Sequence, residues 1–166
     1  MQLHGLIHSL PVYVKQFLVA FVIVLSIGYF TGLQFVRQTE SDHPAGIEEN
    51  YLGNEDIDDA AVMKFKKGER EMLTIIHTHI LSISFIFVLL GGLVAITSLP
   101  RKLKAFLMIE PFVSIVLTFG GIYLMWAGML WMKWVVMISG TLMTLVFIAS
   151  ALLVLIQLLK RSNINN

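Results

Sequence analysis

The chain has 166 residues, of which 57% are hydrophobic and 14% are charged, with no cysteine and a formal net charge of +1. Soluble domains carry roughly 45–50% apolar and about 25% charged residues, so this composition excludes an ordinary globular fold and a disordered chain. The absence of cysteine excludes disulfides, zinc–thiolate sites, iron–sulfur clusters and covalently attached haem. A net charge so close to zero argues against a nucleic-acid-binding surface.

Four segments are long and apolar enough to cross a bilayer, for which a helix needs about 20 residues. The predicted membrane helices cover residues 12–36, 72–99, 103–127 and 131–159. Short connections join the second helix to the third and the third to the fourth, so these helices must run antiparallel. The sequence therefore predicts an all-α integral membrane protein, a single domain over residues 1–166 with four transmembrane helices in an antiparallel bundle.

The first predicted helix carries Lys15 near its start and continues with a long apolar run. No small-residue cleavage site follows this run, which favours a retained membrane helix over a cleaved signal peptide. Gly28 and Gly32 have the spacing of a close helix-crossing motif, although glycine is common in membrane helices.

One acidic extramembrane loop, residues 37–71, connects the first two helices. Residues 40–59 hold eight carboxylates and no Lys or Arg, whereas residues 63–70 are rich in Lys and Arg. The acidic stretch is typical of a solvated loop, and the alternative is a recognition surface for a basic extramembrane partner. For that alternative, the basic residues would lie along the lipid headgroups. The partner would contact Glu48, Glu49, Glu55 and Asp56.

His77 and His79 are the only ionisable residues in the second predicted helix. Two positions along a helix differ by about 200° of rotation, so the two imidazoles cannot ligate one metal or one haem together. His77 shares its face with small and polar residues, so we expect it to face the bundle. The same rotation directs His79 toward lipid or another subunit. The residues on the face of His77 are Thr74, Ser84, Gly91 and Ala95.

Two interpretations of this histidine pair remain open. The helix is longer than the bilayer requires, so both side chains can lie at headgroup depth, where they need no function. Alternatively, His77 or His79 binds a cofactor such as haem b or a quinone. The second haem ligand would then be His43, Met125, Met132 or a residue of another copy of the chain.

Glu110, followed by Pro111, is the one carboxylate in the third predicted helix. A buried carboxylate in lipid is costly, so this group should be neutral, paired or hydrated. It is either a proton or ion relay, or a group near the interface that pairs with Lys104 or Arg101. Polar and small residues share its side of the helix and predict a seam that faces the bundle: Ser114, Thr118, Gly121, Met125 and Gly128.

Two further patterns are assigned to packing and to the membrane surface. One face of the fourth predicted helix carries residues that indicate helix packing: Ser139, Met143, Ser150 and Gln157. Several large aromatic residues indicate a belt near one membrane surface: Tyr29, Tyr123, Trp126, Trp131 and Trp134.

The Lys and Arg residues are divided six against six between the two sides of the membrane, so their count leaves the orientation open. One side holds Lys15, Arg101, Lys102, Lys104, Lys160 and Arg161, and the other holds Arg37, Lys64, Lys66, Lys67, Arg70 and Lys133. Residues 101–104 form a compact basic cluster without acids, which favours the first side as cytoplasmic. We expect both termini in the cytoplasm and the protein in a bacterial inner (plasma) membrane.

The chain has no phosphate-binding loop, no Ser–His–Asp set and no paired metal motif, so we expect no catalytic activity of its own. The sequence favours an accessory or anchoring subunit of a larger membrane complex, such as a respiratory or other electron-transfer complex. Its partners would be lipid and other membrane subunits or copies of itself. The alternatives are a b-type haem- or quinone-binding electron carrier using His77, and a small proton- or ion-coupled transporter using Glu110.

Overall fold

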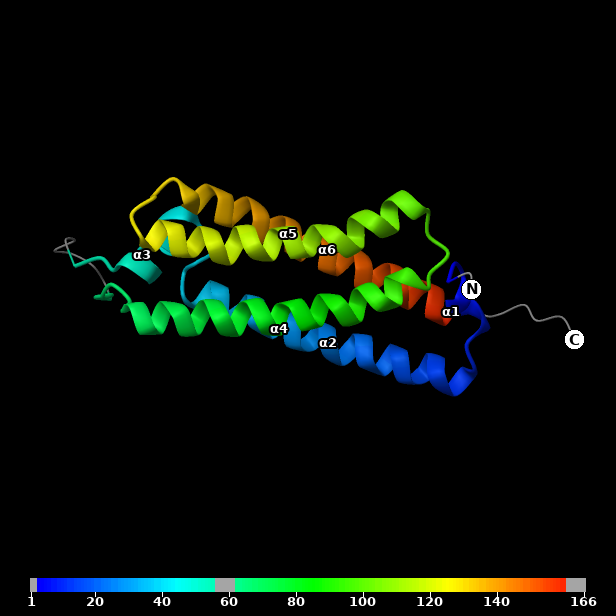
Figure 1. Cartoon of the computed structure of the whole chain (residues 1–166). Coiled ribbons are helices and arrows are strands. Elements are labelled where there is room, and N and C mark those ends of the chain that lie inside the picture. The colour runs from blue at the N-terminus through cyan, green and yellow to red at the C-terminus, as the bar shows by residue number, and fades with distance from the viewer. Residues whose placement is uncertain (1–2, 56–61, 161–166) are drawn as a thin grey trace, which may run out of the picture.

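The computed structural model describes residues 3–55 and 62–160 (Figure 1). These residues form six helices and no strand: α1 (Leu6–Ser9), α2 (Val12–Gln38), α3 (Pro44–Leu52), α4 (Glu69–Ala95), α5 (Arg101–Trp126) and α6 (Met132–Leu159). Helices α2, α4, α5 and α6 are long and apolar enough to cross a membrane. The predicted all-α fold with four membrane-length helices is confirmed.

The end of α4 differs from the sequence prediction, because the helix stops at Ala95 and not at Leu99. Two side chains bind its last carbonyl oxygens. Thr97 Oγ1 donates to Val94 O at 2.6 Å, and Lys104 Nζ donates to Ala95 O at 2.8 Å. These bonds replace the amide donors that a longer helix would supply. Residues 96–100, which the prediction had placed partly in the helix, make the turn into α5.

Helices α5 and α6 form the centre of the bundle, α4 packs on α5, and α2 packs mainly on α6. A Cβ on Gly121 would lie only 2.9 Å from Val136 Cγ2, so a larger residue at this position would force the two central helices apart. The outer helices are much less covered. In its most apolar window, α2 buries 11% of its residues, compared with 44% for α5.

The short helix α1 lies at the end of the bundle where both termini are found (Figure 1). Its backbone binds the turn after α4, with Gly5 N donating to Thr97 O at 3.0 Å and Ile7 N to Ile96 O at 3.1 Å. The Ile7 side chain is fully buried there. These contacts fix the start of α2 to the connection between α4 and α5.

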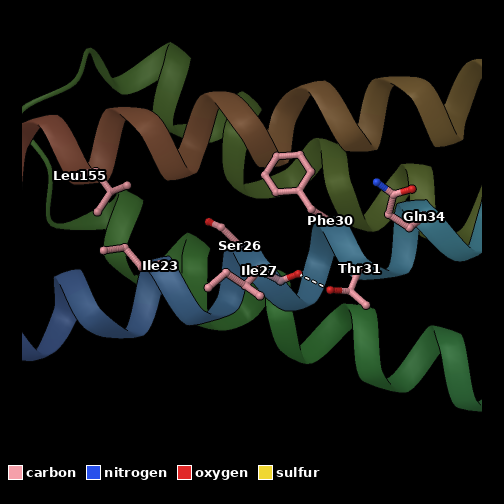
Figure 2. A pocket seen from close by; sticks show the side chains of 7 residues that line it. All are labelled: Ile23, Ser26, Ile27, Phe30, Thr31, Gln34 and Leu155. Atoms are coloured by element: carbon pink, nitrogen blue, oxygen red, sulfur yellow. Dashed lines mark hydrogen bonds between the residues drawn. The ribbon is translucent and has the colours of Figure 1, made fainter.

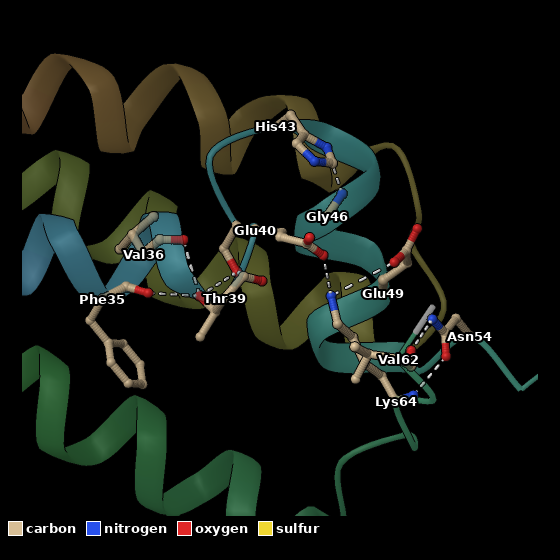
Figure 3. A network of polar contacts seen from close by, with 11 residues as sticks. Phe35, Val36, Thr39, Glu40, His43, Gly46, Glu49, Asn54, Val62 and Lys64 are labelled. Atoms are coloured by element: carbon tan, nitrogen blue, oxygen red, sulfur yellow. Dashed lines mark hydrogen bonds and ion pairs between the residues drawn. The ribbon is translucent and has the colours of Figure 1, made fainter. Parts of the chain in front are cut away.

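At the opposite end of the bundle, the loop contains helix α3, which the sequence analysis missed. His43 Nδ1 accepts a hydrogen bond from Gly46 N at 2.8 Å, and Pro44 occupies the first turn, so the helix has a well-formed start (Figure 3). Glu40 adopts a φ of 57°, which brings its carbonyl against this turn. A Cβ on Gly46 would overlap the Glu40 carbonyl oxygen.

Asn54, just after α3, is hydrogen-bonded to Val62 and Lys64 (Figure 3). Asn54 N donates to Lys64 O at 2.9 Å, and Lys64 N donates to Asn54 Oδ1 at 2.7 Å. Asn54 Nδ2 also donates to Val62 O at 3.0 Å. We refer to residues 40–55 and 62–68 as the α3 platform. It joins the membrane helices where Trp126 Nε1 donates to Lys67 O at 2.8 Å.

Candidate functional site

His77 and His79 lie on different sides of α4, and both are exposed. The ring centroid of His79 is 5.2 Å from that of Phe119 on α5. Trp126, which contacts the α3 platform, lies about 10 Å further along α5. His79 therefore lies about 10 Å along the bundle from the level of Trp126 and the α3 platform.

The expected facing of the two histidines is wrong. His79 lies on the side of α4 that packs on α5, whereas His77 lies on the outward side beside Leu73 and Thr74. The prediction took small and polar residues as the mark of the packed face. In the structure the buried face of α4 consists mainly of large apolar side chains, namely Met72, Phe87, Leu90 and Val94. Of the small and polar residues on the predicted face, Gly91 is buried, and a Cβ there would lie 3.8 Å from Met108 Cγ of α5.

His79 Nδ1 lies 2.7 Å from Ile75 O. A carbonyl oxygen only accepts, so Nδ1 carries the hydrogen and Nε2 carries the lone pair that a metal or haem iron would need. Of the intrachain ligands suggested by the sequence, His43 caps α3, and Met125 and Met132 are buried among apolar residues of the bundle. Among the described residues, no three His, Cys, Asp or Glu side chains come together as a metal site.

Glu110 lies near the middle of α5 and points into the bundle. Ser114 Oγ donates to Glu110 Oε1, while Oε2 is buried and has no hydrogen-bond partner among the described residues. The alternative pairing with Lys104 is not formed, because Lys104 Nζ binds Ala95 O at 2.8 Å. The predicted bundle-facing stripe is confirmed for Ser114, Thr118, Gly121 and Met125, which are all buried.

A second buried oxygen without a partner lies on α6, where Ser150 Oγ makes no hydrogen bond to any described residue. The register between the central helices is set by Thr118 Oγ1, which lies 2.7 Å from Ser139 Oγ, and by the approach of Gly121 to Val136. Continued along the two antiparallel helices, this register places Ser150 within about one turn of Glu110. The sequence assigned Ser150 to packing alone.

Tyr29 also belongs to this level of the bundle and not to an aromatic belt. Its ring stacks on Phe147 with centroids 3.8 Å apart, and its hydroxyl lies 3.3 Å from Thr144 Oγ1. The register of α5 against α6 places Phe147 opposite Glu110, so the stacked Tyr29 ring lies at the level of Glu110. We refer to Glu110, Ser114 and Ser150, with Tyr29 beside them, as the Glu110 seam.

An open groove runs along the exposed side of α2 (Figure 2). Its hydroxyl groups are used within the helix, since Ser26 Oγ donates to Val22 O and Thr31 Oγ1 to Ile27 O. The other lining residues are Ile23, Ile27, Phe30, Gln34 and, from α6, Leu155. This is a mainly apolar surface with no cluster of polar groups directed at a ligand.

The acidic residues predicted to contact a partner have different surroundings. Glu48 Oε2 binds Lys133 Nζ at 2.6 Å, and Glu49 Oε2 lies 3.8 Å from Lys64 Nζ. Glu55 is exposed, and Asp56 lies outside the described residues. Half of the predicted contact set is therefore engaged within the chain.

Lys64 also donates to Glu40 Oε2 at 2.8 Å, so two carboxylates share one ammonium (Figure 3). This hydrogen bond and the positive charge hold the pKa of the Glu40 carboxyl group below its usual value. The α3 platform is therefore held in part by charge pairing at the surface.

A protein family described as a transmembrane helical domain matches residues 41–165. The chain belongs to this family. The matched region contains α3 to α6, and α2 precedes it. The chain is thus a membrane protein whose helices contact the lipid bilayer. No curated protein and no solved structure matches it.

Proposed function

We propose that this protein is an accessory or anchoring subunit of a larger membrane complex, which it joins through the exposed faces of α2 and α4. The exposure of both His77 and His79 supports this most directly. Ionisable residues within membrane spans almost always face a bundle interior, a water-filled cavity or a partner group. One neighbouring helix beside His77, and another at the edge of the α4–α5 contact beside the exposed part of His79, would give each imidazole such surroundings.

The loose packing of α2 also favours a neighbouring helix. A Cβ on Gly28 or Gly32 would meet nothing within 4 Å, so the close approach that this spacing permits is not used within the chain. Small residues four positions apart let the backbones of two membrane helices come together. The neighbour is a helix of another subunit or of a second copy.

The test is purification from native membranes in a mild detergent, comparing the parent chain with His77→Leu and His79→Leu. We expect the parent to elute in a particle larger than the monomer, and each variant to weaken the association by roughly 1 kcal/mol. Ile138→Leu is the control, because Ile138 is an exposed apolar residue on α6, outside the proposed contact faces. A parent chain that elutes alone as a monodisperse monomer contradicts the proposal.

A second candidate function is that of a b-type haem carrier, with the haem held between this chain and a neighbour. The Nδ1 bond of His79 supports it, because that bond leaves Nε2 as the ligating atom. A visible spectrum of the complex purified with haem supplied should then contain a Soret band that His79→Ala removes and His77→Ala leaves. A complex without this band contradicts the haem function and leaves the subunit function standing.

We further propose that both termini are cytoplasmic and that the α3 platform lies outside. The termini share one end of the bundle, and the compact basic residues Arg101, Lys102 and Lys104 are at that end. Because the chain has no cysteine, single cysteines can report the orientation. A cysteine at Glu55 should react with an impermeant maleimide in intact cells, and one at Ser9 should react only after lysis. The opposite pattern contradicts this orientation.

A basic extramembrane partner is a further proposal for the platform. Exposed Glu55 is available for it, whereas Glu48 and Glu49 would have to give up contacts with Lys133 and Lys64. Such association would be steered by charge and should weaken above about 0.15 M salt. Neutralising Glu48, Glu49, Glu55 and Asp56 together should slow binding. A variant that binds as fast as the parent at low salt contradicts this proposal.

A further inference from the structure

The centre of the bundle brings together oxygen atoms that the chain itself does not satisfy. Glu110 Oε2 and Ser150 Oγ are both buried without a hydrogen-bond partner among the described residues, and Ser150 is only 2% exposed. Leaving one buried polar atom unpaired costs roughly 1–3 kcal/mol. Two such atoms within about one helical turn of each other indicate a shared ligand and not two separate defects.

A third oxygen is available at the same level. Pro111 has no amide hydrogen, so it cannot donate to Leu107 O in the way that a residue in a regular helix does. The register of α5 against α6 places Leu107 opposite Ser150. The proline therefore leaves the Leu107 carbonyl oxygen without its usual amide donor at the level of Ser150.

Within residues 3–55 and 62–160, no positively charged side chain pairs with the carboxyl group. From α4, the buried side chains that face the bundle here are apolar, namely Phe87, Leu90 and Val94. Between its ends α6 contributes hydroxyl groups and no charge, and α2 contributes Tyr29, which binds Thr144. Lys104, on α5 itself, is held by Ala95 O. Glu110 and Tyr29 are thus the titratable groups that meet at this level.

We propose that Glu110, Ser150 and the Leu107 carbonyl bind a single water molecule, through which the Glu110 carboxyl group takes up and releases a proton. The water donates to Leu107 O and to Ser150 Oγ, and it accepts from the Oε2 hydroxyl of the protonated carboxyl group. Buried waters typically make about three such bonds. On release, the Oε2–H bond breaks while an O–H bond forms on the water, and the resulting hydronium ion gives up a proton to solvent. On uptake both changes are reversed.

Ser114 and Tyr29 have distinct parts in this site. Ser114 donates to Oε1 in either state, so the proton is confined to Oε2. Tyr29 stacks on Phe147 and covers the site from α2. The proton-binding site therefore needs three membrane helices, and it is formed within one chain whether or not that chain has partners.

The test is infrared spectroscopy of the full chain in lipid nanodiscs, titrated from high to low pH. We expect a protonated-carboxyl C=O band that shifts in D2O and is lost completely in Glu110→Gln. Ser150→Ala should shift the band by removing one bond to the water. Glu48→Gln is the control, because Glu48 binds Lys133 outside the bundle, and its spectrum should retain the band.

Three results would overturn the proposal. The first is a spectrum with no protonated-carboxyl band that depends on Glu110 at any pH. The second is a band that Ser150→Ala and Ser114→Ala both leave unmoved, which keeps the test decisive if Glu110→Gln fails to fold. The third is a band that disappears on exchanging potassium for sodium at constant pH, which would assign the site to a metal cation.

Discussion

The α3 platform and the Glu110 seam are both rich in polar groups, but they satisfy these groups in different ways. In the platform, Glu40 and Glu49 share Lys64, and Glu48 binds Lys133. In the seam, Glu110 is bound only by the hydroxyl of Ser114, and one of its oxygens has no partner among the described residues. A charged group next to water can be hydrated when its ion pair is lost. A polar group inside a membrane bundle has no such replacement, so leaving it unpaired costs free energy. Polar atoms that stay unpaired in the bundle are therefore the stronger indication of function.

The platform depends first on close backbone packing, so the largest effect is expected from Gly46→Val. A side chain here would overlap the Glu40 carbonyl oxygen and displace α3, with a loss of about 3 kcal/mol. Limited proteolysis of the loop and equilibrium unfolding in detergent would measure it. Gly28→Val is the control, since a Cβ at Gly28 meets nothing within 4 Å. Equal protease resistance of the two variants would show that α3 does not rely on this contact.

Next to the Glu110 seam, the central helices α5 and α6 are joined by a pair of hydroxyl groups, and Thr118→Val tests what this pair contributes. The variant removes the 2.7 Å contact with Ser139 Oγ and should cost about 1 kcal/mol. A double-mutant cycle with Ser139→Ala, measured by unfolding in detergent, isolates the contact. Because neither group is charged, the cost should be the same at low and high salt. A strong salt dependence would contradict this description of the pair.

A smaller effect, but one sensitive to salt, is expected for the platform pair Glu48–Lys133. Both side chains are partly exposed, with 30% and 26% of their surface accessible, so Lys133→Met should cost less than about 1 kcal/mol. Thermal unfolding at increasing salt should reduce the difference between parent and variant. A difference that grows with salt would argue against an electrostatic contribution.

The smallest effect concerns Glu40, whose side chain is exposed. Because Lys64 lowers the pKa of Glu40 in the folded chain, the pair stabilises the platform at pH values above the ordinary glutamate pKa. This contribution is lost as the pH falls through the lowered value and the carboxylate becomes protonated. Hydrogen exchange of the α3 amides should therefore quicken slightly on acidification in the parent. In Glu40→Gln the same change should be absent.

The membrane helices were predictable from the sequence because apolar runs of sufficient length have few alternatives in a bilayer. Helix α3 was not, since its residues are polar and its start depends on the His43 cap and on the close fit at Gly46. Glu110 was identified as an ionisable residue within a span. Ser150 was not, because only the pairing of α5 with α6 reveals that its hydroxyl lacks a partner. The facing of His77 and His79 was mistaken because the buried face of α4 is formed mainly by bulky apolar residues, and Gly91 is the one buried member of the predicted stripe.

The attachment of the N-terminal segment has a consequence for the synthesis of the protein. His8 contacts Ser98, 90 residues later in the chain, and Tyr29 contacts Thr144, 115 residues later. At roughly 5–20 residues per second, a ribosome needs on the order of 5–20 s to make the residues in between. During this interval α2 must remain in the bilayer without the helix on which it finally packs. The surface of α2 is long and apolar, and it stays exposed in the folded bundle. Such a surface is stable in lipid, so α2 can remain in the bilayer before α6 is synthesised.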